Sequence, residues 1–143
     1  MTELVELYRT AERMNVSVYH FPLPKTGSLS LIDEEGNCVI GMDLPSRRSE
    51  TEQRVRLAHE LGHCATGCFY NRWSPCDVRR YHENQADRFA VHTLIPLEEL
   101  DEAIAEGYTE QWELADYFGV DVPFLRKALC LYTYGNLATE LYF

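Results

Sequence analysis

The spacing of hydrophobic residues changes character along the amino-terminal part of the chain. In residues 2–14 apolar side chains recur with the period of a helix, which predicts a helical segment. Short runs rich in β-branched and apolar residues follow and are separated by turn residues. They predict strands at 16–21, 28–32 and 38–42, with the last two forming an antiparallel hairpin around residues 33–37. We therefore expect a small antiparallel sheet of about three strands.

The remainder of the chain has helical periodicity. Ser49 or Thr51 can cap a helix over residues 50–69, and Glu52 completes a capping box with Ser49. The same periodicity predicts four further helices, at 77–94, 97–105, 109–118 and 122–132. The expected fold class is α+β, with the sheet packed on the 50–69 helix. We expect a core over residues 1–96 and a helical C-terminal segment over 97–143 packed on it.

Composition limits the classes of protein to which this chain can belong. Its 143 residues suit one domain with a sizeable core, and no apolar run reaches the ~18 residues of a membrane span. The acidic start, Met1–Glu6, does not resemble a signal peptide, so we expect a cytoplasmic protein without membrane contact. A net charge of −10 opposes an extensive phosphate-binding surface, so direct binding of nucleic acid is not expected. The odd count of five cysteines is typical of free thiols.

One short motif within the 50–69 helix carries the chemistry. His59 and His63 lie about 40° apart around a helix, so both can reach one metal ion. Glu60 projects toward the same side, where it can take a proton from a metal-activated water. This is the HExxH pattern of zinc peptidases, and it predicts one Zn²⁺ with an open position for water.

A third metal ligand is expected from the next helix. Glu83 and Asp87 are four residues apart and share a helical face. Glu83 is predicted to bind zinc, and Asp87 to accept the hydrogen bond from the non-ligating nitrogen of a zinc histidine. His82 is the alternative ligand, but it points about 100° away from Glu83, so only one of the two can face the metal.

Two linked motifs resemble the ImmA/IrrE family of bacterial metallopeptidases. Residues 56–63 read RLAHELGH, and residues 83–96 read ENQADRFAVHTLIP. They are similar to the family pattern AHELGH followed by ExxA(N/D)xFAxxLLMP, with Val55 and Ile95 as modest departures. Residues 113–120 also resemble the helix-turn-helix-like segment that follows the peptidase core. The resemblance covers roughly residues 50–130.

The resemblance implies a zincin-like fold and a zinc endopeptidase that cleaves helix-turn-helix transcriptional repressors. Such anti-repressor enzymes are often encoded beside their repressor in mobile elements or stress regulons. The family's metal ligands correspond to His59, His63 and Glu83, and its general base to Glu60. The partner expected from the resemblance is therefore a protein substrate, a helix-turn-helix repressor.

Some assignments stay open at this point. An oxyanion stabiliser is expected near the metal, with Tyr70, Tyr81, His82 and Arg88 as candidates. The strand at 38–42 is a candidate sheet edge for an extended substrate. Trp112 is expected in the core. Cations Arg126 and Lys127 lie on the second helix of the pair 113–129, where packing or repressor docking is favoured over DNA contact.

Two rival hypotheses remain. A structural zinc site would use a different ligand set, which comprises His63, Cys64, Cys68, Cys76 and His82. Against it, Cys64 and Cys68 fall on the apolar stripe of their helix, and the chain has no Cys-x-x-Cys pair. The second rival is a non-catalytic zinc-containing regulator that binds a repressor or DNA without cutting. The presence of every catalytic side chain argues against it.

Overall fold

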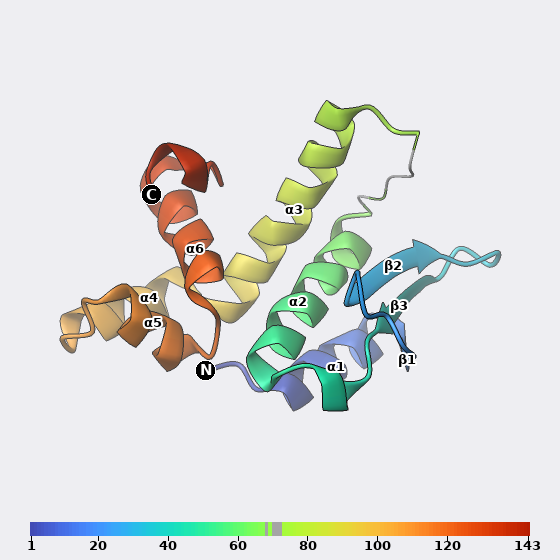
Figure 1. Ribbon diagram of the computed structural model, residues 1–143, viewed down its shortest axis with the longest axis horizontal. Coiled ribbons are helices and arrows are strands. Elements are labelled where there is room, and N and C mark those ends of the chain that lie inside the picture. Colours follow the sequence, from blue (N-terminus) through green and yellow to red (C-terminus); the bar gives the residue numbers. More distant parts are fainter. Residues whose placement is uncertain (68, 70–72) are drawn as a thin grey trace.

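The computed structural model describes residues 1–67, 69 and 73–143. In these residues one α-helix is followed by three strands and then by five further α-helices (Figure 1). The elements are α1 (Leu4–Arg13), β1 (Ser17–His20), β2 (Ser28–Ile32), β3 (Cys38–Met42), α2 (Glu50–Thr66), α3 (Cys76–Leu94), α4 (Leu97–Ala105), α5 (Gln111–Phe118) and α6 (Val122–Tyr134). Two short 3₁₀ helices lie at Pro45–Arg47 and Thr139–Leu141. The α+β class predicted from periodicity is confirmed.

The sheet is mixed, with the strand order β1-β3-β2. β2 and β3 form the predicted antiparallel hairpin, with Ser30 opposite Ile40. β1 runs parallel to β3, so the prediction of an antiparallel sheet was wrong for this pair. The pattern of apolar residues predicts where a strand lies but not its neighbour in the sheet. Residues 21–27 connect β1 to β2 on opposite sides of β3, and this connection places β1 beside β3. β3 is the central strand, which rules out the hypothesis that substrate pairs with it.

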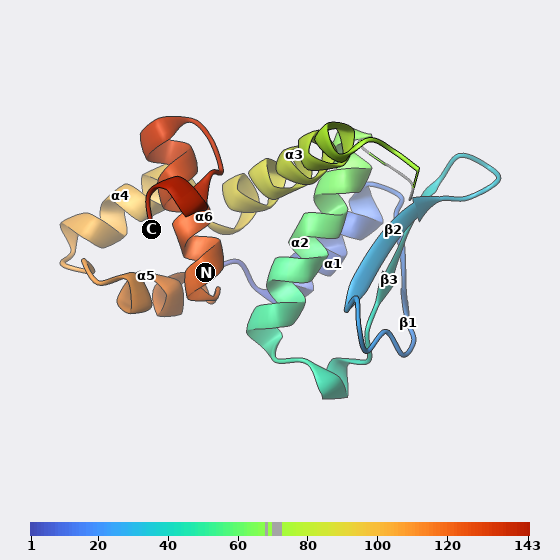
Figure 2. The ribbon, with the colours of Figure 1, turned by 45° about the horizontal axis from the view of Figure 1, so that its top comes forward.

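Helix α2 is the element around which the layers are arranged. Figures 1 and 2 show it between the sheet and α3, with α1 packed alongside. Its buried stripe includes Leu57 and Leu61, both fully buried. The Ser49 side chain accepts a hydrogen bond from the Glu52 amide, and the helix ends at Gly67 with φ of 67°. The predicted start of this helix at Ser49 is confirmed.

The backbones of α2 and α3 come close together at a glycine. A Cβ atom added to Gly62 would lie 2.5 Å from the carbonyl oxygen of Ala86 and 2.8 Å from its Cα. Ala86 and Ala90 on the facing side of α3 are fully buried. Small residues on both helices therefore allow the backbones to come close enough for side chains of α2 and α3 to share one site.

The C-terminal helices pack on the far end of α3, at the left of Figure 1. One cluster of buried apolar residues extends from Leu7 to Leu131 and includes Phe118 and Leu125, both fully buried. Trp112 is 63 % exposed, so its predicted place in the core was wrong. The buried face of α5 is built from other residues, which are Leu114, Ala115 and Phe118. The boundary at residue 96 stays a prediction.

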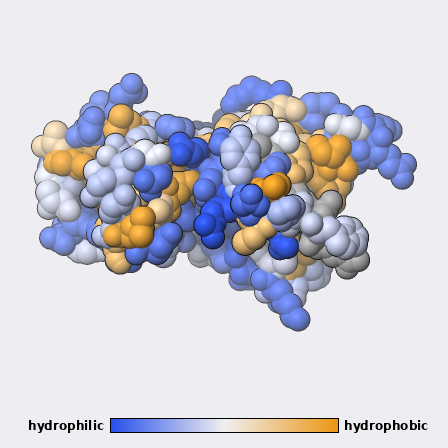
Figure 3. All heavy atoms as spheres, turned by 90° about the horizontal axis from the view of Figure 1, so that it is seen from above, coloured by the Kyte–Doolittle hydropathy of each residue, from blue (hydrophilic) through white to orange (hydrophobic). Residues whose placement is uncertain are grey.

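Hydrophilic side chains gather in the narrower middle of the molecule, between the C-terminal helices and the rest (Figure 3). Apolar side chains form separate small groups to either side on this face. No helix within the described ranges is both long and apolar enough to cross a membrane.

Cys38 of β3 and Cys64 of α2 form a disulfide, with their Cα atoms 5.7 Å apart. The prediction of free thiols was therefore wrong for this pair. The two residues are 26 positions apart, and they meet because α2 packs across β3. Cys76 and Cys130 are free, while Cys68 lies outside the described residues.

Candidate metal centre

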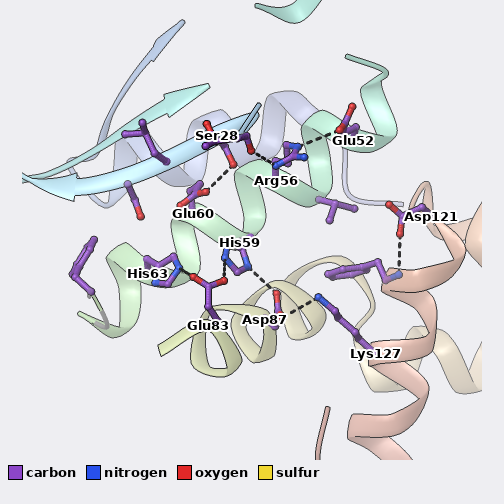
Figure 4. A pocket seen from close by; sticks show the side chains of 16 residues that line it. Ser28, Glu52, Arg56, His59, Glu60, His63, Glu83, Asp87, Asp121 and Lys127 are labelled. Atoms are coloured by element: carbon purple, nitrogen blue, oxygen red, sulfur yellow. Dashed lines mark hydrogen bonds and ion pairs between the residues drawn. The ribbon is translucent and has the colours of Figure 1, made fainter. Parts of the chain in front are cut away.

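A cavity of about 560 Å³ opens between β2, α2, α3 and α6. Strand β2 forms one wall, and the first turns of α6 form part of the opposite wall (Figure 4). Most of the charged side chains among the described lining residues are acidic. The acidic ones are Glu52, Glu60, Glu83, Asp87 and Asp121, and the basic ones are Arg56 and Lys127. An excess of carboxylates favours a cation in this cavity.

Three predicted ligands converge at the base of the cavity. His59 and His63 extend from α2, and Glu83 extends toward them from α3 (Figure 4). Glu83 Oε2 lies 2.8 Å from His59 Nε2, and Glu83 Oε1 lies 3.1 Å from His63 Nε2. One ligand atom from each residue lies within 4.8 Å of the others. The local 3.6-residue period brings the two histidines together, and the close packing at Gly62 brings Glu83 to them.

The donor set fits a divalent metal ion. Two imidazole nitrogens and one carboxylate are the ligands of a catalytic zinc site, at about 2.0–2.2 Å from the ion. Ligand atoms around a tetrahedral ion therefore lie about 3.4 Å apart. The observed 2.8 Å and 3.1 Å separations need only a small outward movement of the Glu83 carboxylate. These three residues could hold one ion.

Asp87 lies where it can orient His59. Nδ1 of His59 donates a hydrogen bond to Asp87 Oδ1 at 2.7 Å, which leaves Nε2 directed at Glu83. Burial disfavours the charged imidazole, but the hydrogen bonds with Asp87 and Glu83 outweigh it and raise the pKa of His59 to about 10. Burial likewise opposes ionisation of Asp87, yet its partners hold the pKa of the carboxyl below its ordinary value. A metal ion must displace the proton on Nε2 in order to bind.

Glu60, the predicted general base, is buried on the same face of α2. Its Oε2 accepts a hydrogen bond of 2.7 Å from Ser28 Oγ on β2 (Figure 4). The side chain lines the cavity next to His59 and His63. The hydrogen bond engages one carboxylate oxygen. Within the described part of the chain the other oxygen has no hydrogen-bond partner and is available to a reacting group in the cavity.

Three of the four candidates for an oxyanion stabiliser are not among the described residues that line this cavity. Tyr81 is 57 % exposed, and Arg88 donates a hydrogen bond to the carbonyl oxygen of Gly135. Neither of them, nor His82, is among the described residues that line the cavity. Tyr70 lies outside the described residues, so its role stays a prediction.

The alternative ligand sets are not assembled in the described part of the chain. His82 is not a member of the cluster formed by His59, His63 and Glu83. Cys64 is joined to Cys38, which removes it from the rival structural zinc site.

Three functional groups in the cavity were missed by the sequence reasoning. Ser28 is bonded to Glu60, Lys127 is bonded to Asp87, and Arg56 donates to the carbonyl oxygen of Thr26 just before β2. Ser28 carries no local signal, since an isolated serine on a strand is common. Arg126 and Lys127 were weighed as cations for DNA contact against packing or repressor docking of their helix, and Arg126 bonds to Gln111 and Lys127 to Asp87.

A comparison with protein families agrees with this geometry. The model of the IrrE N-terminal-like domain, peptidase family M78, matches residues 11–129. The chain belongs to the M78 peptidase family. The resemblance to ImmA/IrrE proteins is thereby confirmed. Membership of this family supports a metallopeptidase type of function, and the α+β architecture is consistent with a zincin-like fold. A comparison with curated proteins finds no match. The M78 match includes every residue of the metal cluster and extends through most of α6.

Proposed function

We propose that this protein is a zinc-dependent endopeptidase that cleaves a helix-turn-helix transcriptional repressor. The observation that carries the proposal is the convergence of His59, His63 and Glu83 in a cavity that also holds Glu60. Membership of the M78 family supports a peptidase, and the resemblance to ImmA/IrrE proteins supports the repressor as substrate. A cytoplasmic location follows from this substrate and stays a prediction.

Each side chain has a definite task in this proposal. His59, His63 and Glu83 would hold the ion, which when bound supplies a Lewis acid that activates water and polarises the scissile carbonyl. Glu60 accepts the proton of the attacking water and then delivers it to the leaving amine. Asp87 keeps the proton of His59 on Nδ1, so that Nε2 is the ligating atom.

The edge of β2 supports an extended substrate. In the described residues β3 is the only strand that pairs with β2, and residues of β2 line the cavity. Ser28, Leu29 and Ser30 line the cavity at this edge. We infer that a peptide segment adds to β2 as a further strand, which would lay its backbone across the metal cluster.

The test begins with metal content. The purified protein is expected to hold stoichiometric zinc by elemental analysis, and Glu60→Gln is expected to hold the same amount, because Glu60 is not a ligand. Each is then incubated with a helix-turn-helix repressor encoded beside its gene, and the products are identified by mass spectrometry. Cleavage by the wild-type protein that is lost in Glu60→Gln supports the proposal.

Two results would overturn it. A protein that binds no zinc is not a zinc peptidase. A protein that binds zinc and repressor equally in both forms, and cleaves in neither, is a non-catalytic regulator.

A further inference from the structure

Lys127 of α6 reaches the metal centre from a part of the chain outside the two ligand helices. Its Nζ lies 2.9 Å from Asp87 Oδ2, across 40 positions of sequence. Figure 4 shows Lys127 extending from α6 toward Asp87, with His59 on the far side of the carboxylate. A continuous line of contacts therefore runs from α6 to a predicted metal ligand.

The Asp87 carboxylate is held by a different partner at each oxygen. Oδ1 accepts from His59 Nδ1 at 2.7 Å, and Oδ2 accepts from Lys127. The side chain is only 13 % exposed, so water does little to compensate the charge if a partner is lost. With Lys127 in place, two contacts instead of one fix the plane of the carboxylate, and one of its oxygens is the acceptor for His59.

Arg56, the second cation among the described residues of the cavity, has different partners. Arg56 bonds to Glu52 and to the carbonyl oxygen of Thr26, on the β2 side. Among the described residues that line the cavity, Lys127 is thus the cation that serves the Asp87 side. Its helix is well anchored, because Asp121 caps the first turn and Leu125 is fully buried.

We propose that Lys127 is a positioning residue of the metal centre, acting through Asp87 to hold His59 in its ligating orientation. The inference rests on the metal site of the proposed function and deepens it. In this proposal helix α6, which follows the helix-turn-helix-like segment, contributes a side chain that supports the metal centre.

The experiment compares zinc affinity in four proteins. We expect Lys127→Ala to weaken zinc binding about tenfold, which is the lower end of the effect of losing a group that supports a ligating histidine. Lys127→Arg keeps a cation at this place and is expected to recover most of the affinity. Arg126→Ala is the matched control, since Arg126 is the neighbouring cation of α6 but bonds to Gln111. Affinity is measured by competition with a chromogenic chelator at fixed pH.

Two further readouts separate positioning from general damage. The visible spectrum of the Co²⁺-substituted protein is expected to change in Lys127→Ala and to stay the same in Arg126→Ala. Thermal unfolding of the metal-free proteins reports the fold independently. If the wild-type protein binds zinc and Lys127→Ala has the same zinc affinity and the same Co²⁺ spectrum, the role of Lys127 is wrong but the proposed function still stands. A wild-type protein that binds no zinc overturns the proposed function, and this inference with it.

Discussion

Ser28 Oγ donates a hydrogen bond of 2.7 Å to Glu60 Oε2, which ties strand β2 to the predicted general base on α2. We expect Ser28→Ala to lower the rate of peptide cleavage about tenfold without lowering zinc content. A hydrogen bond to a charged group contributes about 1.5 kcal/mol, and this corresponds to about one order of magnitude in rate. The measurement is kcat on a cleaved repressor, beside zinc analysis.

Ser30→Ala is the control for this change, because Ser30 lies on the same strand and also lines the cavity. Equal losses of rate in the two variants would show that the hydrogen bond between Ser28 and Glu60 makes no specific contribution to cleavage.

The ligand set predicts a clear loss of metal on substitution. His63→Ala and Glu83→Gln are expected to reduce bound zinc from stoichiometric to near background, because a site with two protein ligands binds zinc weakly. His20→Ala is the control, since His20 lies on β1 and its contact is with Tyr8. Elemental analysis after dialysis checks this, and full zinc retention by Glu83→Gln would remove Glu83 from the ligand set.

The approach of α2 to α3 predicts the effect of a single methyl group. In Gly62→Ala the new Cβ would meet the backbone of Ala86, which cannot turn aside as a side chain can. We expect a loss of about 1–3 kcal/mol in the free energy of unfolding from overpacking, together with weaker zinc binding. Urea denaturation measures the first effect.

Ala65→Ser, on the exposed side of the same helix, is the matched control for Gly62→Ala and is expected to change neither quantity. A Gly62→Ala protein as stable as the wild type would mean that α2 and α3 are farther apart at this position than in the structure.

The disulfide predicts a redox-dependent stability. It closes a loop between residues 26 positions apart, and a loop of this size contributes about 3.5 kcal/mol by restricting the unfolded chain. Reduction is expected to lower the midpoint of thermal unfolding of the wild type, and Cys64→Ala to abolish this response. Cys76→Ser is the control, because Cys76 is a free, exposed thiol. Disulfides are rare in the cytosol, so a thiol count on protein trapped in cells tests the predicted location at the same time.

The hydrogen bonds of Asp43 predict that the protein loses stability at low pH. Its Oδ1 accepts from the Leu23 amide and its Oδ2 from Arg48 Nε, each at 2.8 Å. The backbone hydrogen bond is the largest cause that lowers the pKa of this carboxyl, to about 2, and burial opposes it. Because the folded pKa lies below the ordinary value of 3.8, the contribution to stability is complete above that pH. It is lost as pH falls toward about 2.

Asp43→Asn cannot ionise, so we expect the difference in unfolding free energy between wild type and variant to shrink between pH 4 and pH 2, values chosen to bracket this pKa shift. Urea denaturation at several pH values measures it. A difference that stays constant over this range would contradict the assignment of acid sensitivity to Asp43.

Much of the fold and the metal cluster followed from local patterns. The period of apolar residues located each of the six α-helices in the described residues to within a few residues, but neither of the two 3₁₀ helices was predicted. The bounds of β2, β3 and α4 were predicted correctly. His59 and His63 share a face because of helix geometry alone, and the same holds for Glu83 and Asp87. The pairing of the two helices was inferred from the chemistry of a zinc site and from the family resemblance, and the structure brings these four side chains together.

What the sequence by itself determined, then, are the features set within a few residues along the chain: the helices, the strands, and the ligands as pairs on their own helices. The tertiary structure alone decided the parallel place of β1, the partner of Cys38, the contact of Ser28 with Glu60 and that of Lys127 with Asp87. The last two contacts join residues 32 and 40 positions apart. Local periodicity carries no information about such separations, because they depend on how α2, α3 and α6 pack against one another and against the sheet.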